Sequence, residues 1–173
     1  RIHKTLLYGK KLGIIGLGAI GKTLAKVSKG LNFDIYAFDK NIDHNFRKEN
    51  NINYISLEQI MEECDIISIH LSLNHKTRNL INKEMISKMK KNAIIINASR
   101  GGIVDENELF NALEGKRIGG AALDVYNYEP YKGPLSKLDN IIMTPHIGSY
   151  AKEIRIAMEI EAAENLIRGF NAE

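Results

Sequence analysis

The chain has 173 residues, 44% of them hydrophobic and 26% charged, which is typical of a globular protein large enough for a sizeable core. Its net charge of +3, with 24 basic and 21 acidic side chains scattered along it, disfavours a nucleic acid as partner. No apolar run is long enough to cross a membrane, and Cys64, the one cysteine, fits a reducing compartment such as the cytoplasm.

Short apolar runs alternate with amphipathic stretches, which predicts strands alternating with helices in a single domain over residues 1–173. The predicted strands are 11–15, 34–38, 65–70, 93–97, 118–123 and 140–143. The predicted helices are 20–31, 57–63, 83–89, 106–113 and 151–167. Gly169 is the expected end of the last helix, and Ser56 with Gln59 and Asp105 with Glu108 have capping-box spacing. Strands apolar on both faces indicate a doubly wound α/β fold, a parallel sheet covered by helices on both sides.

The first predicted strand leads into a glycine-rich turn, GLGAIG at residues 16–21, which opens the first helix. In such a turn Gly16 permits the tight bend, Gly18 lets a pyrophosphate approach the backbone, and Gly21 lets the helix pack closely on the strand. The helix N-terminus offers free N–H groups to the phosphates. This predicts a Rossmann-type dinucleotide site, although the glycine pattern is weak by itself.

The second predicted strand ends in Asp39, about 20 residues after the turn, where an acidic residue holds the ribose hydroxyls of a dinucleotide. A carboxylate there repels a 2′-phosphate, so we expect NAD rather than NADP. Lys40 is the one cation next to it in the sequence, and a single lysine beside an aspartate is a poor phosphate clamp. The alternative is a structural glycine turn followed by an unrelated exposed aspartate.

Polar residues recur where the later predicted strands end. Arg100 follows the fourth strand, Asp124 and Glu129 follow the fifth, and His146 follows the sixth. In a parallel sheet these positions converge on one edge, where a guanidinium can bind a carboxylate through two hydrogen bonds. Each also has an ordinary interpretation, as an exposed cation, a cap, a loop charge or a structural histidine. Together with a dinucleotide loop they favour a catalytic site.

Five stretches of the chain resemble the NAD-binding domain of the D-isomer-specific 2-hydroxyacid dehydrogenases, the family of phosphoglycerate, D-lactate and glyoxylate/hydroxypyruvate enzymes. They are YGKKLGIIGLGAIGKTLAK, SLEQIMEECDIISIHLSLNHKTRNLIN, NASRGGIVDENELFNAL, GGAALDVYNYEP and NIIMTPHIGSY. The resemblance implies an NAD-dependent oxidoreductase that interconverts a D-2-hydroxy acid and its 2-keto acid by hydride transfer. The stretch TPHIGSYAKE is most similar to the D-3-phosphoglycerate dehydrogenase type.

The resemblance implies Arg100, Glu129 and His146 as the catalytic residues. Arg100 would anchor the substrate carboxylate, and His146 would give a proton to the carbonyl oxygen while NADH delivers hydride. Glu129 would hydrogen-bond the imidazole, fix its tautomer and favour its charged form. No metal site is expected. The cofactor positions given by the glycine turn and the resemblance together are Gly16, Gly18, Ala19, Ile20, Gly21, Asp39, Ser72, Thr77, Ala98, Asp124, which would face the nicotinamide carboxamide, and Gly148.

Members of this family carry a second, substrate-binding domain formed from both chain ends, and the resemblance implies that it lies outside the present sequence. We therefore expect residues 1–173 to bind NAD with little or no turnover, and to form homodimers. Two alternatives stay open. A non-catalytic NAD(H)-binding regulator of the corepressor type can keep the same fold and the same three residues, and a methyltransferase or another nucleotide-binding domain would need only the glycine turn.

Overall fold

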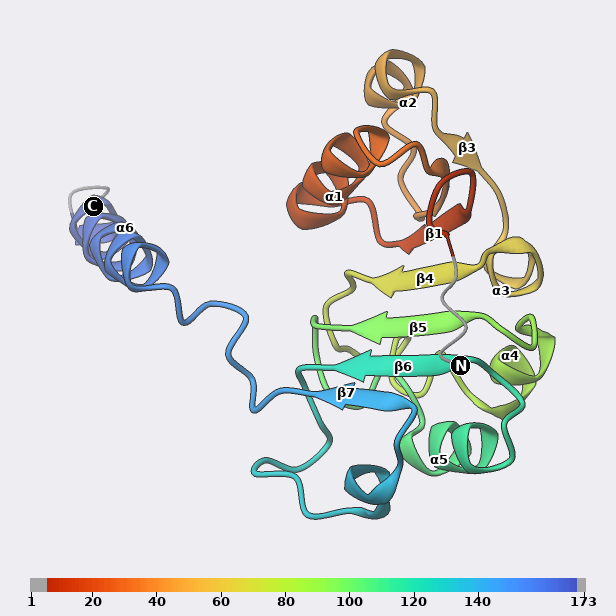
Figure 1. Ribbon diagram of the computed structural model, residues 1–173. Helices are drawn as coiled ribbons and strands as arrows, with labels where there is room; N and C mark the ends of the chain where they lie inside the picture. Colours follow the sequence, from red (N-terminus) through yellow and green to blue (C-terminus); the bar gives the residue numbers. More distant parts are fainter. Residues whose placement is uncertain (1–5, 171–173) are drawn as a thin grey trace.

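Figure 1 shows the computed structural model, which describes residues 6–170. Seven strands form one parallel sheet with the order β3-β2-β1-β4-β5-β6-β7, which confirms the predicted α/β fold. The strands are β1 (Lys11–Ile15), β2 (Asp34–Phe38), β3 (Asn53–Tyr54), β4 (Ile66–Ile69), β5 (Ile94–Asn97), β6 (Gly120–Leu123) and β7 (Ile141–Met143). The helices are α1 (Ala19–Lys29), α2 (His44–Asn50), α3 (Leu57–Glu63), α4 (Lys83–Lys88), α5 (Glu106–Glu114), the 3-10 helix η1 (Pro134–Lys137) and α6 (Lys152–Phe170).

The sheet changes its direction of winding at β1 and β4, its two central strands. From β1 the chain proceeds outward to β2 and β3, and then returns to β4 on the other side of β1. Ile15 at the end of β1 pairs with Phe38 of β2 and with Ile69 of β4. Doubly wound sheets bind ligands in the crevice outside the carboxyl ends of such strands. The GLGAIG turn follows β1 and therefore lies at this crevice.

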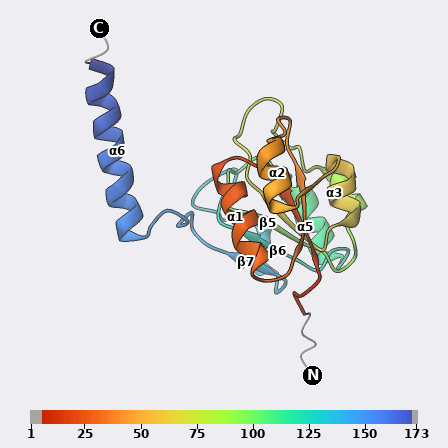
Figure 2. The same cartoon turned by 90° about the horizontal axis from the view of Figure 1, so that it is seen from above.

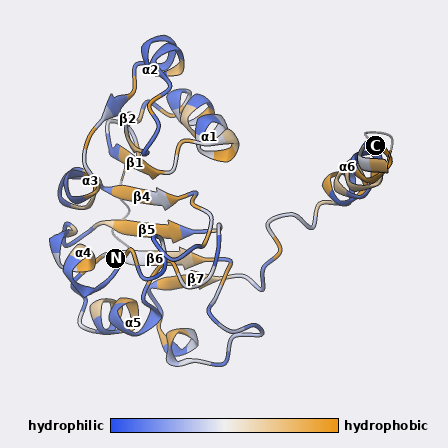
Figure 3. Cartoon of the chain, turned by 180° about the vertical axis from the view of Figure 1, so that it is seen from behind, coloured by the Kyte–Doolittle hydropathy of each residue, from blue (hydrophilic) through white to orange (hydrophobic). Residues whose placement is uncertain are grey.

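Helices pack on both sides of the sheet, and the apolar strands lie between them (Figures 2 and 3). The smaller core cluster includes Leu12 of β1, Ala25 of α1 and Phe46 of α2. The larger cluster includes Ile95 of β5 and Leu109 of α5, together with buried side chains of α3 and α4. The two clusters hold the strands and helices together, and so fix the points from which the loops at the carboxyl ends of the strands start.

The sheet is less covered at β5 and β7 than the sequence indicated. Ile95 is fully buried, but its neighbour Ile94 is 39% exposed and Ile142 of β7 is 70% exposed. Successive side chains of a strand point to opposite faces, so the exposed positions share the face opposite Ile95. Within residues 6–170, helices therefore cover both faces only toward β1 and β2, and one face of β5–β7 stays open.

Side-chain caps set the start of two helices. Ser56 accepts a hydrogen bond from the N–H of Gln59, and the Gln59 side chain accepts one from the N–H of Ser56, which confirms the predicted capping box of α3. Asp105 likewise caps α5 by accepting from the N–H of Glu108. The N–H of Asp105 donates to the carbonyl of Ile81 at 3.0 Å, so the reciprocal half of this second box is replaced by a tertiary contact.

The sequence did not predict α2 and β3. α2 buries only Phe46 and Asn50, too few apolar positions to give a helical period. Asp43 caps it by accepting from the N–H of Phe46 at 3.0 Å, and Asn51 ends it with a left-handed φ of 51°. β3 has two residues and pairs with β2 at the edge of the sheet. The cap of α2 ties Asp43 to the start of that helix.

α6 lies apart from the sheet, joined to β7 by an extended segment (Figures 1 and 2). None of its 19 residues is buried. It continues past Gly169, its expected end, to Phe170. A glycine inside an exposed helix costs about 1 kcal/mol relative to alanine and does not stop a helix by itself. No helix among residues 6–170 has the length and apolar content needed to cross a membrane.

Candidate active site

The turn between β1 and α1 has the geometry of a phosphate-binding loop. Gly16 has a left-handed φ of 94°, and a Cβ there would lie 2.6 Å from the carbonyl oxygen of His70. Gly21 is buried, and a Cβ there would clash with the carbonyl oxygen of Gly16. Gly18 is exposed, and a Cβ there would meet no atom within 4 Å. The space above Gly18 is thus open to a ligand, as a close approach of phosphate to the backbone requires.

Asp39 lies directly beside this turn. Its carboxylate accepts hydrogen bonds from the N–H of Leu17 at 2.7 Å and from the N–H of Asn41 at 2.9 Å. Gly18 is the N-cap of α1, and the first turn of this helix carries no acidic residue that would occupy its N–H groups. A pyrophosphate at the helix N-terminus would therefore place the adjoining ribose near Asp39. The residues present fit a dinucleotide.

The other predicted cofactor positions also follow the carboxyl ends of strands or open α1. The exposed ones are Ala19, Ile20, Ser72, Ala98 and Gly148. Thr77 differs, because its hydroxyl donates to the carbonyl of Ser72 at 2.7 Å and accepts from the N–H of Asn74 at 2.8 Å. Its hydroxyl therefore shapes the loop after β4. Contact of these residues with NAD stays a prediction.

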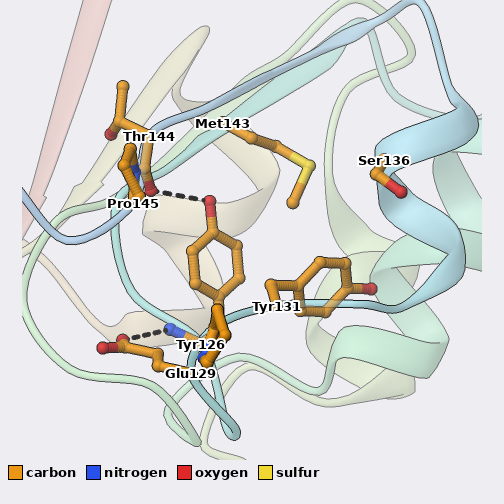
Figure 4. Close-up of a pocket in the computed structure, with 8 residues that line it drawn as sticks. Tyr126, Glu129, Tyr131, Ser136, Met143, Thr144 and Pro145 are labelled. Carbon is orange, nitrogen blue, oxygen red and sulfur yellow. Dashed lines mark hydrogen bonds between the residues drawn. The ribbon is translucent and has the colours of Figure 1, made fainter.

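Glu129 and His146 meet at the edge of the sheet. The Nδ1 atom of His146 and the Oε2 atom of Glu129 are 2.8 Å apart, which is the predicted hydrogen bond. The second oxygen of Glu129 accepts from the N–H of Tyr126 at 3.1 Å (Figure 4). The hydrogen bond from His146 holds the pKa of Glu129 below its usual value. Because a carboxylate only accepts, it fixes the proton on Nδ1, so that Nε2 is the other nitrogen of the ring that can exchange a proton.

The loop that carries His146 is held by Asp124, which is 8% exposed. The carboxylate of Asp124 accepts from the N–H of Ile147 at 2.9 Å, from the N–H of Gly148 at 2.8 Å and from the hydroxyl of Thr144. These partners flank His146 on both sides along the chain. His146 itself adopts a left-handed φ of 55°, a conformation that is uncommon outside glycine. Asp124 thus fixes the backbone on which the imidazole is mounted.

The environment of Asp124 keeps its side chain charged. Burial acts to raise its pKa, but the hydrogen bonds from Thr144, Ile147 and Gly148 outweigh burial and hold the pKa below its usual value. The predicted contact of Asp124 with the nicotinamide carboxamide stays a prediction. The structure adds a role that sequence reasoning missed, the anchoring of the His146 loop.

Arg100 follows β5 in a loop shaped by Asn97, which is 2% exposed. The side-chain oxygen of Asn97 accepts from the N–H of Ser99 at 3.1 Å and from its hydroxyl at 2.8 Å, and the Asn97 amide donates to the carbonyl of Arg100 at 2.9 Å. The exposed guanidinium donates to the carbonyl of Ser99 at 2.6 Å. Among the described residues, no hydrogen bond or ion pair joins Arg100 to Glu129 or His146. A polar Asn97 ending an apolar run was the available sequence signal for this loop.

The glycines after Arg100 bring its loop against the one that carries Glu129. A Cβ on Gly101 would clash with the carbonyl oxygen of Tyr126, and Gly102 has a left-handed φ of 78°. Gly101 is thus explained by the close contact between these two backbones. β5, β6 and β7 are neighbours in the sheet, so the structure brings the three loops of the predicted catalytic residues to one edge.

A cavity of about 530 Å³ lies next to Glu129 (Figure 4). Its lining residues are Tyr126, Glu129, Pro130, Tyr131, Ser136, Met143, Thr144 and Pro145. The hydroxyl of Tyr126 donates to the carbonyl of Thr144 at 2.9 Å and so forms part of its wall. Neither Arg100 nor His146 is among its lining residues, although Glu129, the partner of His146, is. Residues 6–170 contain no group of three or more His, Cys, Asp or Glu side chains placed to hold a metal ion.

Known proteins match this chain over most of its length. Residues 1–148 match the family model described as the D-isomer specific 2-hydroxyacid dehydrogenase, NAD binding domain. The glyoxylate reductase of Korarchaeum cryptofilum is 40% identical over 163 residues, which cover 93% of this chain and 49% of that protein. The D-3-phosphoglycerate dehydrogenase of Methanocaldococcus jannaschii is 41% identical over 172 residues, which cover 96% of this chain and 33% of that protein.

A similar solved structure is an acyclic imino acid reductase in complex with NADPH and D-Arg. Its TM-score is 0.87 at 30% identity, over 97% of this chain and 53% of that chain. The present chain therefore spans about half the length of the proteins it matches, or less.

Asp124→Asn should destabilise the chain by about 1–3 kcal/mol at neutral pH, because an amide replaces one acceptor oxygen with a donor that faces backbone N–H groups. The folded-state pKa of Asp124 is lowered, so its stabilisation is present above the unfolded-state pKa and is lost as pH falls through the folded value. Urea unfolding followed by circular dichroism should show a difference that is large at neutral pH and shrinks in acid.

Asp139→Asn is the matched control for this measurement, because Asp139 is exposed and should show no such loss. A penalty for Asp124→Asn that is the same at neutral and acid pH would contradict the proposed anchoring by its charge.

Proposed function

Because the chain belongs to the D-isomer-specific 2-hydroxyacid dehydrogenase family through its NAD-binding domain, we propose that its protein transfers hydride between NAD(H) and C2 of a 2-hydroxy or 2-keto acid. The observation that carries this proposal is the 2.8 Å hydrogen bond between Glu129 and His146 at the sheet edge that also carries the glycine turn. A nucleotide-binding domain of another class has no need for a carboxylate-backed imidazole at this place.

Each residue of the site has a physical task in this reaction. The glycine turn and the start of α1 would hold the pyrophosphate, and Asp39 would hold the ribose. The cofactor, when bound, supplies or accepts the hydride at C2. Arg100 binds the substrate carboxylate through two parallel hydrogen bonds. In reduction, the Nε2 atom of His146 donates a proton to the carbonyl oxygen, and in oxidation it takes the proton of the hydroxyl.

Glu129 supports His146 by a positioning effect and an electrostatic one. Its hydrogen bond to Nδ1 orients the ring, and its charge stabilises the imidazolium that donates the proton. Asp124, which anchors the loop on both sides of His146, fixes the backbone that carries the ring. Such positioned acid–base catalysis contributes about 100- to 10,000-fold in rate.

Asp39 supports NAD as the cofactor. The matching family model is an NAD-binding domain, whereas the acyclic imino acid reductase with the same fold binds NADPH, so the fold by itself does not select between them. Selection then depends on side chains at the end of β2, where the adenosine ribose would lie. The Asp39 carboxylate is fixed there by the N–H of Leu17, and it disfavours a 2′-phosphate by charge repulsion.

The substrate is a small acid whose carboxylate Arg100 can bind. D-3-phosphoglycerate and glyoxylate are the first candidates, because relatives at 41% and 40% identity are named for them. We also propose a homodimer, which the exposed Ile94 and Ile142 on the open face of the sheet support. A reducing compartment such as the cytoplasm fits the single cysteine of the sequence, Cys64, which is a free buried thiol.

His146→Ala in the full-length gene product should lower turnover by about 100- to 10,000-fold and leave the Kd for NADH nearly unchanged. NADH oxidation with a panel of 2-keto acids measures turnover, and NADH fluorescence measures binding. His44→Ala, at an exposed histidine at the start of α2, should behave as wild type. Full turnover by His146→Ala would remove His146 from catalysis, and NADH binding with no turnover by wild type would favour the regulator.

Glu129→Gln should move the high-pH limit of the reduction rate to lower pH. The glutamine keeps a hydrogen bond to Nδ1 but removes the negative charge that stabilises the proton-donating form of the imidazole. The measurement is the pH profile of kcat for NADH oxidation in wild type and variant. A profile that falls in amplitude without shifting would show that Glu129 acts by position alone.

Asp39→Ala should weaken NADH binding and reduce the preference for NADH over NADPH, because both the ribose acceptor and the charge opposing a 2′-phosphate are removed. Fluorescence titration of the 173-residue chain with each nucleotide gives the two Kd values. Unchanged values for both nucleotides would exclude Asp39 from the binding site.

A further inference from the structure

We propose that Asp43 is a second residue that selects NAD over NADP, by holding the ammonium group of Lys22 in an ion pair beside the ribose site. This inference rests on the proposed binding of NAD. The sequence drew attention to Lys40 as the cation next to Asp39. The fold brings a different cation, Lys22, to the same place.

Lys22 belongs to the helix that opens the cofactor site. Its N–H donates to the carbonyl of Gly18 at 2.9 Å, so its backbone is fixed by the glycine turn. Its Nζ atom lies 2.6 Å from the Oδ2 atom of Asp43 and 5.2 Å from the centre of the Phe46 ring. The ammonium group is thus held between a carboxylate and an aromatic face.

Asp43 is itself rigidly placed. Its Oδ1 atom accepts from the N–H of Phe46 at 3.0 Å and caps α2, while its Oδ2 atom pairs with Lys22. The hydrogen bond between them raises the pKa of Lys22 and lowers that of Asp43, so both side chains are charged at neutral pH. One aspartate therefore joins the first turns of α1 and α2.

The ion pair lies near the place where NAD and NADP differ. Asp39 hydrogen-bonds the glycine turn through Leu17, and its negative charge also contributes to raising the pKa of Lys22. The charge of Asp39 disfavours a 2′-phosphate, and the ion pair with Asp43 keeps the ammonium group of Lys22 from binding one. Without the charge of Asp43, Lys22 would be a free ammonium group in the first turn of α1, and lysine is a common ligand of phosphate.

Asp43→Asn is the decisive variant. Asparagine caps helices as well as aspartate does, so α2 should stay in place while the charge is lost. The Kd for NADPH should fall about two- to fivefold, the range expected for one exposed ion pair, and the Kd for NADH should stay unchanged. The gain should shrink as salt is added, because it is electrostatic. Fluorescence titration of the 173-residue chain measures all of these values.

Two control variants identify the source of the gain. Lys22→Gln combined with Asp43→Asn should abolish it, because the released cation is gone. Glu63→Gln breaks a matched ion pair, in which Lys11 and Glu63 are 2.9 Å apart and their side chains are 32% and 40% exposed, against 34% and 40% for Lys22 and Asp43. Lys11 begins β1, at the opposite end of that strand from the glycine turn, so Glu63→Gln should leave the NADPH affinity as in wild type.

NADPH binding to wild type could be too weak to titrate. In that case the single variant Asp39→Asn is compared with the double variant that carries both Asp39→Asn and Asp43→Asn. The double variant should bind NADPH more tightly than the single one. Normal NADH binding with an unchanged NADPH affinity after loss of the Asp43 charge would overturn this inference and leave the proposed function intact. A gain that persists without Lys22 would also overturn it. Failure of wild type to bind NADH would overturn the proposed function, and this inference with it.

Discussion

All seven strands run in the same direction, and this constraint places the whole candidate site. A parallel sheet gathers the carboxyl ends of its strands at one edge, and the change of winding between β1 and β4 opens a crevice there. Loops that are distant in the sequence become neighbours at this edge: the glycine turn follows β1, Asp39 follows β2, and the three loops of the predicted catalytic residues follow β5, β6 and β7. The buried clusters under the helices supply the rigidity that keeps these loops at one level.

Much of this fold could be predicted from the sequence, because apolar runs, caps and glycines act locally. The helix at Leu57–Glu63 was predicted with its true ends, since Ser56 and Gln59 specify its start without help from the rest of the chain. α2 and β3 were missed because a short polar helix with two buried side chains, and a strand of two residues, depend on contacts with α1 and β2. The open face beside Ile94 was missed because an apolar side chain does not reveal what covers it.

In the site, too, some contacts could be predicted from the sequence, and others depend on how the chain folds. The family resemblance predicted that Glu129 would hydrogen-bond His146, and the two residues do meet because they follow neighbouring strands. The sequence could not show that Asp124 holds the loop of His146, since a carboxylate at a strand end has many potential partners. It also could not show that Lys22 pairs with Asp43, because that contact joins two helices through a turn of the chain whose structure was not foreseen.

At position 146 the backbone and the side chain favour different residues, because the left-handed φ of His146 suits glycine. Glycine adopts such a φ without steric cost, while other L-residues lose about 1–2 kcal/mol in the left-handed helical region. Folding stability alone would therefore favour glycine at position 146, and the histidine is tolerated because Asp124 accepts hydrogen bonds from the residues on either side of it. Glycine at this position would relieve the backbone but would remove the imidazole that hydrogen-bonds Glu129, so the backbone conformation gives no reason for a histidine here.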